Sequence, residues 1–200
     1  MSARVRARRL DARFFARDAP TVARELLGCV LLHRTPYGVL SGRVVETEAY
    51  LASGDPASHS FRGPTSRNAS MFERGGIAYV YRIYGMHHCF NVVTGNVDEG
   101  AAVLVRALEP LAGLEVLRRR RGVEDVRALC SGPAKLVQAL AIGPEHDGVD
   151  LVHGALGLWS DGAEIDDVQT TTRIGITKGA ELPLRFLVQG SPYVSRRTRS

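Results

Sequence analysis

The sequence predicts a single α+β domain in which helices surround a curved, mostly antiparallel β-sheet core. The chain has 200 residues, of which 44% are hydrophobic, and this is enough for one domain with a substantial core. Its expected strands do not alternate regularly with helices, as they do in parallel α/β folds. No internal repeat or linker divides the chain, so residues 11–195 are expected to form the domain. Residues 1–10 are expected to be a flexible basic N-terminus, and residues 196–200 a basic tail.

The first half of the chain is expected to contain one helix, a pair of strands and a long loop. Asp18 and Pro20 are typical of the start of a helix, and Gly28 is typical of its end. The expected helix and the two strands cover residues 19–27, 29–33 and 39–50. Residues 51–76 are rich in glycine, proline, serine and asparagine, and an irregular segment of this length inside a compact domain is often functional.

The second half is expected to contain short strands and two helices. The expected strands cover residues 77–83, 90–94, 101–107, 151–159 and 184–189. A helix over residues 110–121 is predicted to end at Gly122, with arginines in its last turn, where cations suit the helix dipole. Ser131 is the expected cap of a second helix, with Pro133 in its first turn, that runs to about Ile142.

Basic residues outnumber acidic ones by 26 to 21, which gives a formal net charge of +5 and a pI near 9.4. This excess favours a polyanionic partner, although many basic proteins bind none. Only Lys135 and Lys178 are lysines, so a Schiff-base mechanism has few side-chain amines to use.

The chain shows no sign of secretion or of a membrane anchor. The first ten residues lack the apolar stretch of a signal peptide, and no segment approaches the ~18 apolar residues that span a bilayer. We therefore expect a cytoplasmic protein with no membrane partner. Cys29, Cys89 and Cys130 are far apart and odd in number, which argues against a disulfide framework and against a structural zinc site.

Two carboxylates lie close together on one predicted strand. Because side chains alternate across a strand, Val44, Glu46, Glu48 and Tyr50 are expected on one face, and the residues between them on a face that suits the core. Carboxylates two positions apart are roughly 7 Å from each other, a spacing used by acid/base pairs that flank a glycosidic bond. Two solvated glutamates are the simpler interpretation of the pattern alone. The closing tyrosine and a following loop with His59 favour a site, and the pattern leaves the two glutamates equal.

The stretch at residues 79–91 is dense in tyrosine and histidine. Strand tyrosines ordinarily pack in a core or on a sheet face, but they also form surfaces on which nucleobases stack. Tyr84, just before Gly85, is placed to project and to wedge into a base step. His87 and His88 are potential metal ligands, but neighbouring strand residues face opposite ways, and no further ligand motif accompanies them. We therefore expect no metal site.

A third segment, Ser-Gly-Pro-Ala-Lys at residues 131–135, opens a predicted helix. Free N–H groups there, with Lys135 one turn into the helix, would hold a phosphate well. An ordinary capped helix explains the same residues, so both interpretations stay open.

These strings together resemble the alkyladenine (3-methyladenine) DNA glycosylase family. The similarity runs in the family's order from about residue 11 to residue 195, and several ungapped motifs in series make it specific. The matching segments are residues 44–50 and the loop around His59, 67–68, 71–72, 79–81, 84–86, 106–110, 131–136, 185–186 and 190–192. His87 and His88 depart from the pattern, because relatives often carry an aromatic ring there, and this bears on the edge of the pocket and on the substrate range.

The resemblance implies the catalytic residues and therefore separates the two glutamates. Glu48 matches the residue that positions and deprotonates the attacking water, and Arg106 matches one that helps to hold this water. Glu46 is left as a structural neighbour.

The resemblance also implies residues that bind the base and the DNA. Tyr50, His59 and Tyr81 match residues that line the base pocket, and Asn91 matches one whose bulk disfavours the 2-amino group of guanine. Tyr84 matches the side chain that fills the gap left in the duplex. Three further residues match positions that contact the DNA backbone or the minor groove, namely Thr65, Met71 and Lys135.

The expected function is that of a monofunctional DNA glycosylase in base excision repair. It would flip alkylated or deaminated purines, of the 3-methyladenine type, out of double-stranded DNA and hydrolyse the N-glycosidic bond. We expect no cofactor, and a monomer associated with the nucleoid. The alternatives are a bifunctional glycosylase-lyase, a nucleic-acid-binding module without catalysis, and a metal-dependent hydrolase.

Overall fold

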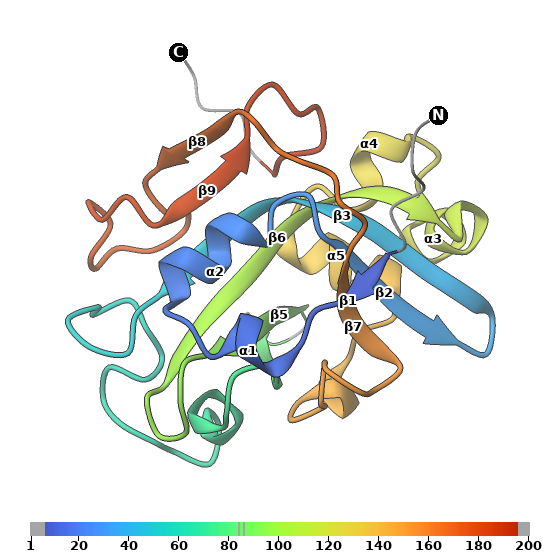
Figure 1. The fold of residues 1–200 in the computed structure, drawn as a ribbon. Helices are drawn as coiled ribbons and strands as arrows, with labels where there is room; N and C mark the ends of the chain where they lie inside the picture. Colours follow the sequence, from blue (N-terminus) through green and yellow to red (C-terminus); the bar gives the residue numbers. More distant parts are fainter. Residues whose placement is uncertain (1–6, 84, 86, 196–200) are drawn as a thin grey trace.

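The computed structural model describes residues 7–83, 85 and 87–195, and within them nine strands form one antiparallel sheet (Figure 1). The strands are β1 (Arg8–Arg9), β2 (Val30–Thr35), β3 (Gly38–Tyr50), β4 (Ala78–Ile83), β5 (His87–Thr94), β6 (Ala101–Ala112), β7 (Leu156–Ser160), β8 (Val168–Thr171) and β9 (Arg185–Val188). The α-helices are α1 (Ala12–Phe15), α2 (Ala19–Glu25), α3 (Leu114–Arg121), α4 (Val126–Leu129) and α5 (Pro133–Leu140). Two 3-10 helices accompany them, η1 (Ala69–Phe72) and η2 (Pro144–His146). The predicted α+β class with a mostly antiparallel sheet is confirmed.

The long strand β3 is the centre of the sheet. The strand order is β1-β7-β2-β3-β6-β5-β4, and the β8–β9 hairpin joins the sheet because β9 also pairs with β3. The first half of β3 therefore lies between β2 and β6, and its second half between β9 and β6. Both glutamates of this strand are consequently buried, with 0% exposure. The interpretation as two solvated glutamates is wrong, because a pattern within one strand does not show which segments will cover it.

Three irregularities interrupt the pairing of β3 with β6. Val44 pairs with Leu108 and Glu46 with Ala107, so Val45 is an extra residue on β3. An extra residue on one strand re-aims the side chains beside it. Val44 accordingly joins the main hydrophobic cluster together with Ala49, and the expectation that it shares a face with the glutamates is wrong.

The helix predictions hold in part. α2 begins as predicted, with the Asp18 carboxylate accepting a 2.9 Å hydrogen bond from the Thr21 N–H, but it ends at Glu25 rather than at residue 27. α3 ends at Gly122 in the left-handed conformation, as predicted. Its predicted start at residue 110 is wrong, because β6 continues to pair with β3 as far as Ala112.

The start of α5 differs from the prediction. Gly132 is the N-cap, with a φ of 156°, and no side chain caps this end of the helix. Ser131 is therefore not the cap, and its hydroxyl instead accepts a 3.2 Å hydrogen bond from Lys135 Nζ. α5 ends at Leu140, two residues before the predicted end.

Several short elements carry too little pattern to be predicted. They are β1, α1, α4 and β8. The segment predicted as a strand over residues 151–159 becomes β7 only from Leu156, because residues 151–154 form turns. Arg9, inside the segment predicted as flexible, pairs with Trp159 and donates to three carbonyls of residues 151–156.

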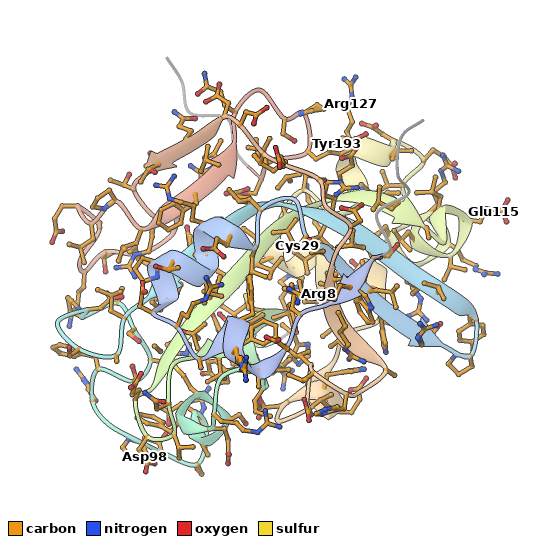
Figure 2. The ribbon with its side chains drawn as sticks, viewed as in Figure 1. Arg8, Cys29, Asp98, Glu115, Arg127 and Tyr193 are labelled. Carbon is orange, nitrogen blue, oxygen red and sulfur yellow. The ribbon has the colours of Figure 1, made fainter. Side chains whose placement is uncertain are left out.

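The core lies between the sheet and its helices. In Figure 1, α2 lies in front of the sheet and packs against β3 and β6, whereas α5 lies behind it and packs against β5 and β6. Figure 2 shows Asp98, Glu115 and Arg127 projecting from the edge of the molecule, while the free thiol of Cys29 is buried. No helix within the described ranges is long and apolar enough to cross a membrane. A smaller cluster of Met71, Ile77, Tyr79, Val93 and Ala102 lies apart from the main core and supports the site.

Candidate active site

A cavity of about 880 Å³ opens beside the second half of β3. Strands β4, β5 and β6 contribute to its wall, together with the 51–76 loop, the start of α5 and residues 174–176. Eight of the ten predicted site residues line it, namely Tyr50, His59, Thr65, Met71, Tyr81, Asn91, Arg106 and Lys135. Tyr84 lies outside the described residues. The fold thus brings to one cavity predicted residues as far apart in the chain as Tyr50 and Lys135.

Glu48 lies directly beneath the cavity and is fully buried. Its Oε2 accepts a 3.0 Å hydrogen bond from the Tyr50 hydroxyl and lies 3.1 Å from Arg106 Nη1. Its Oε1 accepts a 2.8 Å hydrogen bond from the Ile174 N–H. The three donors all belong to residues that line the cavity, so the carboxylate is oriented by the cavity wall itself.

Glu46 has a different set of partners. Its Oε1 accepts from Arg106 Nε at 3.0 Å, from Arg185 Nε at 2.7 Å and from the Ser195 hydroxyl at 2.9 Å. Its Oε2 accepts from the Ser195 N–H at 2.6 Å. Two guanidinium groups and four hydrogen bonds therefore surround this carboxylate, which is the environment of a structural ion pair.

Arg106 connects the two carboxylates because of its place in the sheet. Glu46 pairs with Ala107 and Thr47 with Val105, so Arg106 is an extra residue on β6 opposite the glutamates. Burial alone would lower the pKa of Arg106, but the carboxylates of Glu48 and Glu46 outweigh it and raise this pKa above its ordinary value. The guanidinium is therefore a permanent cation at the base of the cavity.

Aromatic rings form one wall of the cavity. The rings of Tyr79 and Tyr81 are 5.3 Å apart between centroids and tilted by 31°, and His59 stands edge-on to Tyr81 at 4.4 Å. His59 Nδ1 lies 2.8 Å from the Tyr79 hydroxyl. Asn91 donates a 3.0 Å hydrogen bond to the Tyr79 carbonyl, which fixes its side chain beside the rings. Offset and edge-on rings of this kind leave a flat apolar surface for a planar ligand.

The surroundings of His59 lower its pKa. Burial lowers the pKa of His59 below its ordinary value, and the nearby charge of Arg67 lowers it further. The imidazole is therefore neutral near pH 7 and adds no positive charge to the cavity.

The rim loop, residues 59–68, is held in shape by Asn68. The Oδ1 atom of Asn68 accepts from the Thr65 N–H and hydroxyl at 2.6 and 2.9 Å. Its Nδ2 donates to the carbonyls of His59 and Gly63 at 2.9 and 3.2 Å. One buried amide thereby fixes the segment that carries His59 and Thr65.

The mouth of the cavity is rich in cations. Besides the buried Arg106, four basic residues line the cavity, namely Arg62, Arg67, Arg82 and Lys135, and the three arginines among these four are exposed. Met71, in contrast, has an exposed fraction of only 2% and packs against Tyr79, so its expected contact with DNA stays a prediction.

No group of three or more histidine, cysteine or acidic side chains in the described parts of the chain could hold a metal ion. His87 is exposed on β5, and His88, its neighbour, is half-buried.

An ion pair that sequence analysis missed stands behind Tyr50. Arg173 Nη1 and Nη2 donate to the two carboxylate oxygens of Asp55 at 2.6 and 2.7 Å, and both side chains are fully buried. The guanidinium lies over the Tyr50 ring, 4.7 Å from its centroid. The partners are 118 positions apart, so no local pattern could reveal the pair. Ile174, Arg185 and Ser195 were missed for the same reason.

The site defines an enzyme class before any relative is considered. A buried carboxylate lies under an aromatic cavity, and cations line the entrance. This arrangement fits an enzyme that takes a flat base out of a polyanionic duplex and acts on it in a pocket.

Comparison with known proteins agrees with this class. Residues 13–192 match the family model described as methylpurine-DNA glycosylase (MPG). A relative from Methanoculleus marisnigri is 54% identical over 94% of this chain and 99% of its own, and one from Carboxydothermus hydrogenoformans is 47% identical over the same shares. Both bear the provisional name 3-methyladenine DNA glycosylase. The chain belongs to the methylpurine-DNA glycosylase family.

Membership of this family confirms the predicted activity. The protein is a DNA glycosylase, a hydrolase of N-glycosyl bonds that acts on DNA in DNA repair. The comparisons lend no support to the lyase, binding-module or metal-hydrolase alternatives.

Proposed function

We propose that the cavity receives a damaged purine flipped out of double-stranded DNA, and that Glu48 activates the water that replaces the base. The observation that carries this proposal is the position of Glu48, which lies under the cavity with three of its lining residues bonded to its carboxylate. The names of the relatives indicate 3-methyladenine among the bases released.

The hydrogen bonds favour Glu48 over Glu46 as the base. Among the described residues, Glu48 Oε1 accepts a single hydrogen bond, from Ile174, which leaves it the capacity to accept another from water. Glu46 accepts four and lies between two guanidinium groups, so it has less capacity to take a proton. Glu46 instead holds Arg106 in place beside Glu48.

In this mechanism the bond between C1′ and the base breaks first, and the base leaves with the electron pair. The sugar develops oxocarbenium character, which the Glu48 carboxylate stabilises. Water then attacks C1′ while Glu48 accepts its proton. Arg106 Nη1 lies 3.1 Å from Glu48 Oε2, so the guanidinium is placed to hold this water beside the carboxylate.

The wall of the cavity accounts for a preference for damaged purines. An alkylated purine is electron-poor or cationic, and rings such as Tyr50 and Tyr81 bind such a ligand better than a normal purine. The neutral imidazole of His59 does not repel it. Asn91 would disfavour the 2-amino group of guanine, and Tyr84 would fill the vacated stack.

The rim would hold the DNA backbone. Arg62, Arg67, Arg82 and Lys135 are available for phosphate contacts at the mouth, and Thr65 lies on the same rim. All the residues invoked belong to one chain, so a monomer would suffice.

The decisive test is Glu48→Gln, which keeps the shape of the side chain and removes the base. We expect single-turnover release of 3-methyladenine from methylated DNA to fall by roughly 10²–10⁴-fold, the usual contribution of a general base. Binding to damaged DNA should be retained, as measured by gel shift.

Glu99→Gln is the matched control, because Glu99 is exposed on the loop after β5 and should leave release unchanged. Undiminished release by Glu48→Gln would contradict the mechanism. Borohydride should trap no covalent adduct with DNA, and an adduct lost in Lys135→Gln would instead indicate a lyase.

A further inference from the structure

The buried charges behind the cavity are balanced. Three guanidinium groups and three carboxylates meet there, in the pairs of Arg106 and Arg185 with Glu46 and Glu48, and of Arg173 with Asp55. Buried charges are expected to be paired. The Asp55 pair is distinct, because it touches a base-stacking ring rather than the water-activating carboxylate.

Arg173 covers the back of Tyr50. Its side chain has 0% exposure and contributes nothing to the wall of the cavity, whereas Tyr50 lines it. The ring face that Arg173 covers is therefore turned away from the cavity. A cation on one face of an aromatic ring opposes the binding of a second cation on the other, because both draw on the same electron-rich π-system.

Asp55 cancels this opposition. It receives two hydrogen bonds from the guanidinium and two more from the N–H groups of Leu51 and Ala57. Burial alone would raise the pKa of Asp55, but these hydrogen bonds hold it below its ordinary value, so the residue is an anion near pH 7.

We propose that Asp55 is a specificity-determining residue: by neutralising Arg173 behind Tyr50, it permits the cavity to hold a cationic alkylated purine. The inference rests on the proposed function, in which the flipped base stacks on Tyr50. Arg173 also holds the segments next to Tyr50 and Ile174 in place, through hydrogen bonds to the Ala49 and Gly179 carbonyls.

The expected size of the effect follows from the geometry. A base stacked on the free face lies about 3.5 Å from the ring, and hence about 8 Å from the guanidinium. At an effective dielectric constant near 20, an uncompensated charge at this distance disfavours a cationic base by roughly thirtyfold. A neutral base is not affected in this way.

The test is Asp55→Asn, which keeps the shape of Asp55 and leaves Arg173 uncompensated. Single-turnover excision should be compared for a cationic lesion, 7-methylguanine, and for the neutral lesions hypoxanthine and ethenoadenine. Dissociation constants for the same duplexes, measured in a Glu48→Gln background, compare the binding of the lesions independently of base release. The ratio of cationic to neutral lesion should fall in both measurements, by up to about thirtyfold.

Two further variants complete the design. Asp55→Asn combined with Arg173→Gln removes both charges and should restore the ratio, even if the overall rate is lower. Asp161→Asn is the matched control, because Asp161 forms a comparable two-bond pair with Arg43 but lines no part of the cavity. It should leave the ratio unchanged.

An equal loss for cationic and neutral lesions in Asp55→Asn would overturn the inference, as would a lowered ratio in the double variant. If circular dichroism shows that Asp55→Asn does not fold, the ratio of cationic to neutral lesion is measured in Arg173→Gln instead. It leaves the Asp55 anion behind the ring and should raise the ratio, and an unchanged or lower ratio would refute the role. Failure of the proposed function looks different, because the unaltered protein would then release neither kind of lesion or Glu48→Gln would remain active.

Discussion

At the scale of single residues, the site depends on how one guanidinium divides its hydrogen bonds. Arg106 contacts Glu46 through Nε and Glu48 through Nη1, so two carboxylates two positions apart acquire different environments. Glu46 accepts four hydrogen bonds, whereas Glu48 accepts two and forms an ion pair with Arg106. Two chemically identical residues thus differ in environment because of their partners rather than their type.

His59 gives a prediction at this scale. Its pKa is lowered by burial and by Arg67, so the imidazole is neutral at pH 7 and gains a proton only below the ordinary value near 6.5. In Arg67→Gln the pKa of His59 should rise, because one source of the depression is removed. An NMR titration of the imidazole in the free protein measures this directly.

Arg74→Gln is the control for this titration, since Arg74 pairs with Asp150 and does not contribute to the shift of His59. An unchanged pKa of His59 in Arg67→Gln would show that burial alone sets it. In the unaltered enzyme, release of cationic bases should decline as the pH falls through the pKa of His59, because the cavity then gains a positive charge.

At the scale of elements, the site depends on the bulged pair β3–β6 and on the rim loop. The extra residue on β6 places the Arg106 guanidinium on the two glutamates, which a regular ladder would not do. The rim loop has no regular structure, yet the side chain of Asn68 replaces the missing backbone ladder with four hydrogen bonds.

Asn68→Ala tests the rim loop. Loss of these buried hydrogen bonds should cost about 1–3 kcal/mol of unfolding free energy and leave His59 and Thr65 poorly placed. We expect weaker binding of damaged DNA, seen as a raised half-saturation concentration in single-turnover titrations, with a smaller change in the maximal rate. The smaller change is expected because the four hydrogen bonds of Asn68 involve neither Glu48 nor Arg106.

Asn96→Ala is the matched control for the loop. The Asn96 amide bonds only to the exposed Glu99 side chain, so binding and stability should stay near those of the unaltered protein. A normal half-saturation concentration in Asn68→Ala would show that the rim loop does not need this anchor.

At the scale of the whole molecule, distant segments meet across the single sheet. One such meeting lies away from the cavity, where His33 of β2 contacts His146 of η2. Their Nε2 atoms are 3.3 Å apart, and His33 Nδ1 lies 2.8 Å from the Leu140 carbonyl. Burial lowers the pKa of His33, the charges of His146 and Arg120 lower it further, and the Leu140 carbonyl and Glu145 oppose them.

This pair predicts how stability depends on pH. Because the pKa of His33 is lower in the folded than in the unfolded protein, the unfolded chain binds more protons below about pH 6.5. The contribution of His33 is therefore present above that pH and is lost as the pH falls through the folded pKa. The melting temperature should decline between pH 7 and pH 5, and His33→Asn should flatten this decline.

His87→Asn serves as the control, because His87 is exposed at the start of β5. It should keep the pH dependence of the unaltered protein. The same slope in His33→Asn as in the unaltered protein would exclude His33 as its source.

The sequence alone predicted much of the fold and eight of the residues that line the cavity. Strands with a clear pattern, such as residues 39–50, and helices with a polar cap, such as the one after Asp18, were correctly predicted because these signals are local. The start of α3 was not, since the pairing of Ala112 with Ser41 overrides the local helical pattern. Ser131 is not the cap either: its hydroxyl accepts a hydrogen bond from Lys135 Nζ.

The sequence by itself determined the family, the α+β class and several of the residues that line the cavity, because these are carried by ordered motifs along the chain. Only the tertiary structure decided which partners each carboxylate has, and it alone revealed Asp55 and Arg173 behind Tyr50. These depend on contacts between residues more than one hundred positions apart. Burial and charge pairing depend on which residues are neighbours in space, and the local order of residues along the chain does not show these neighbours.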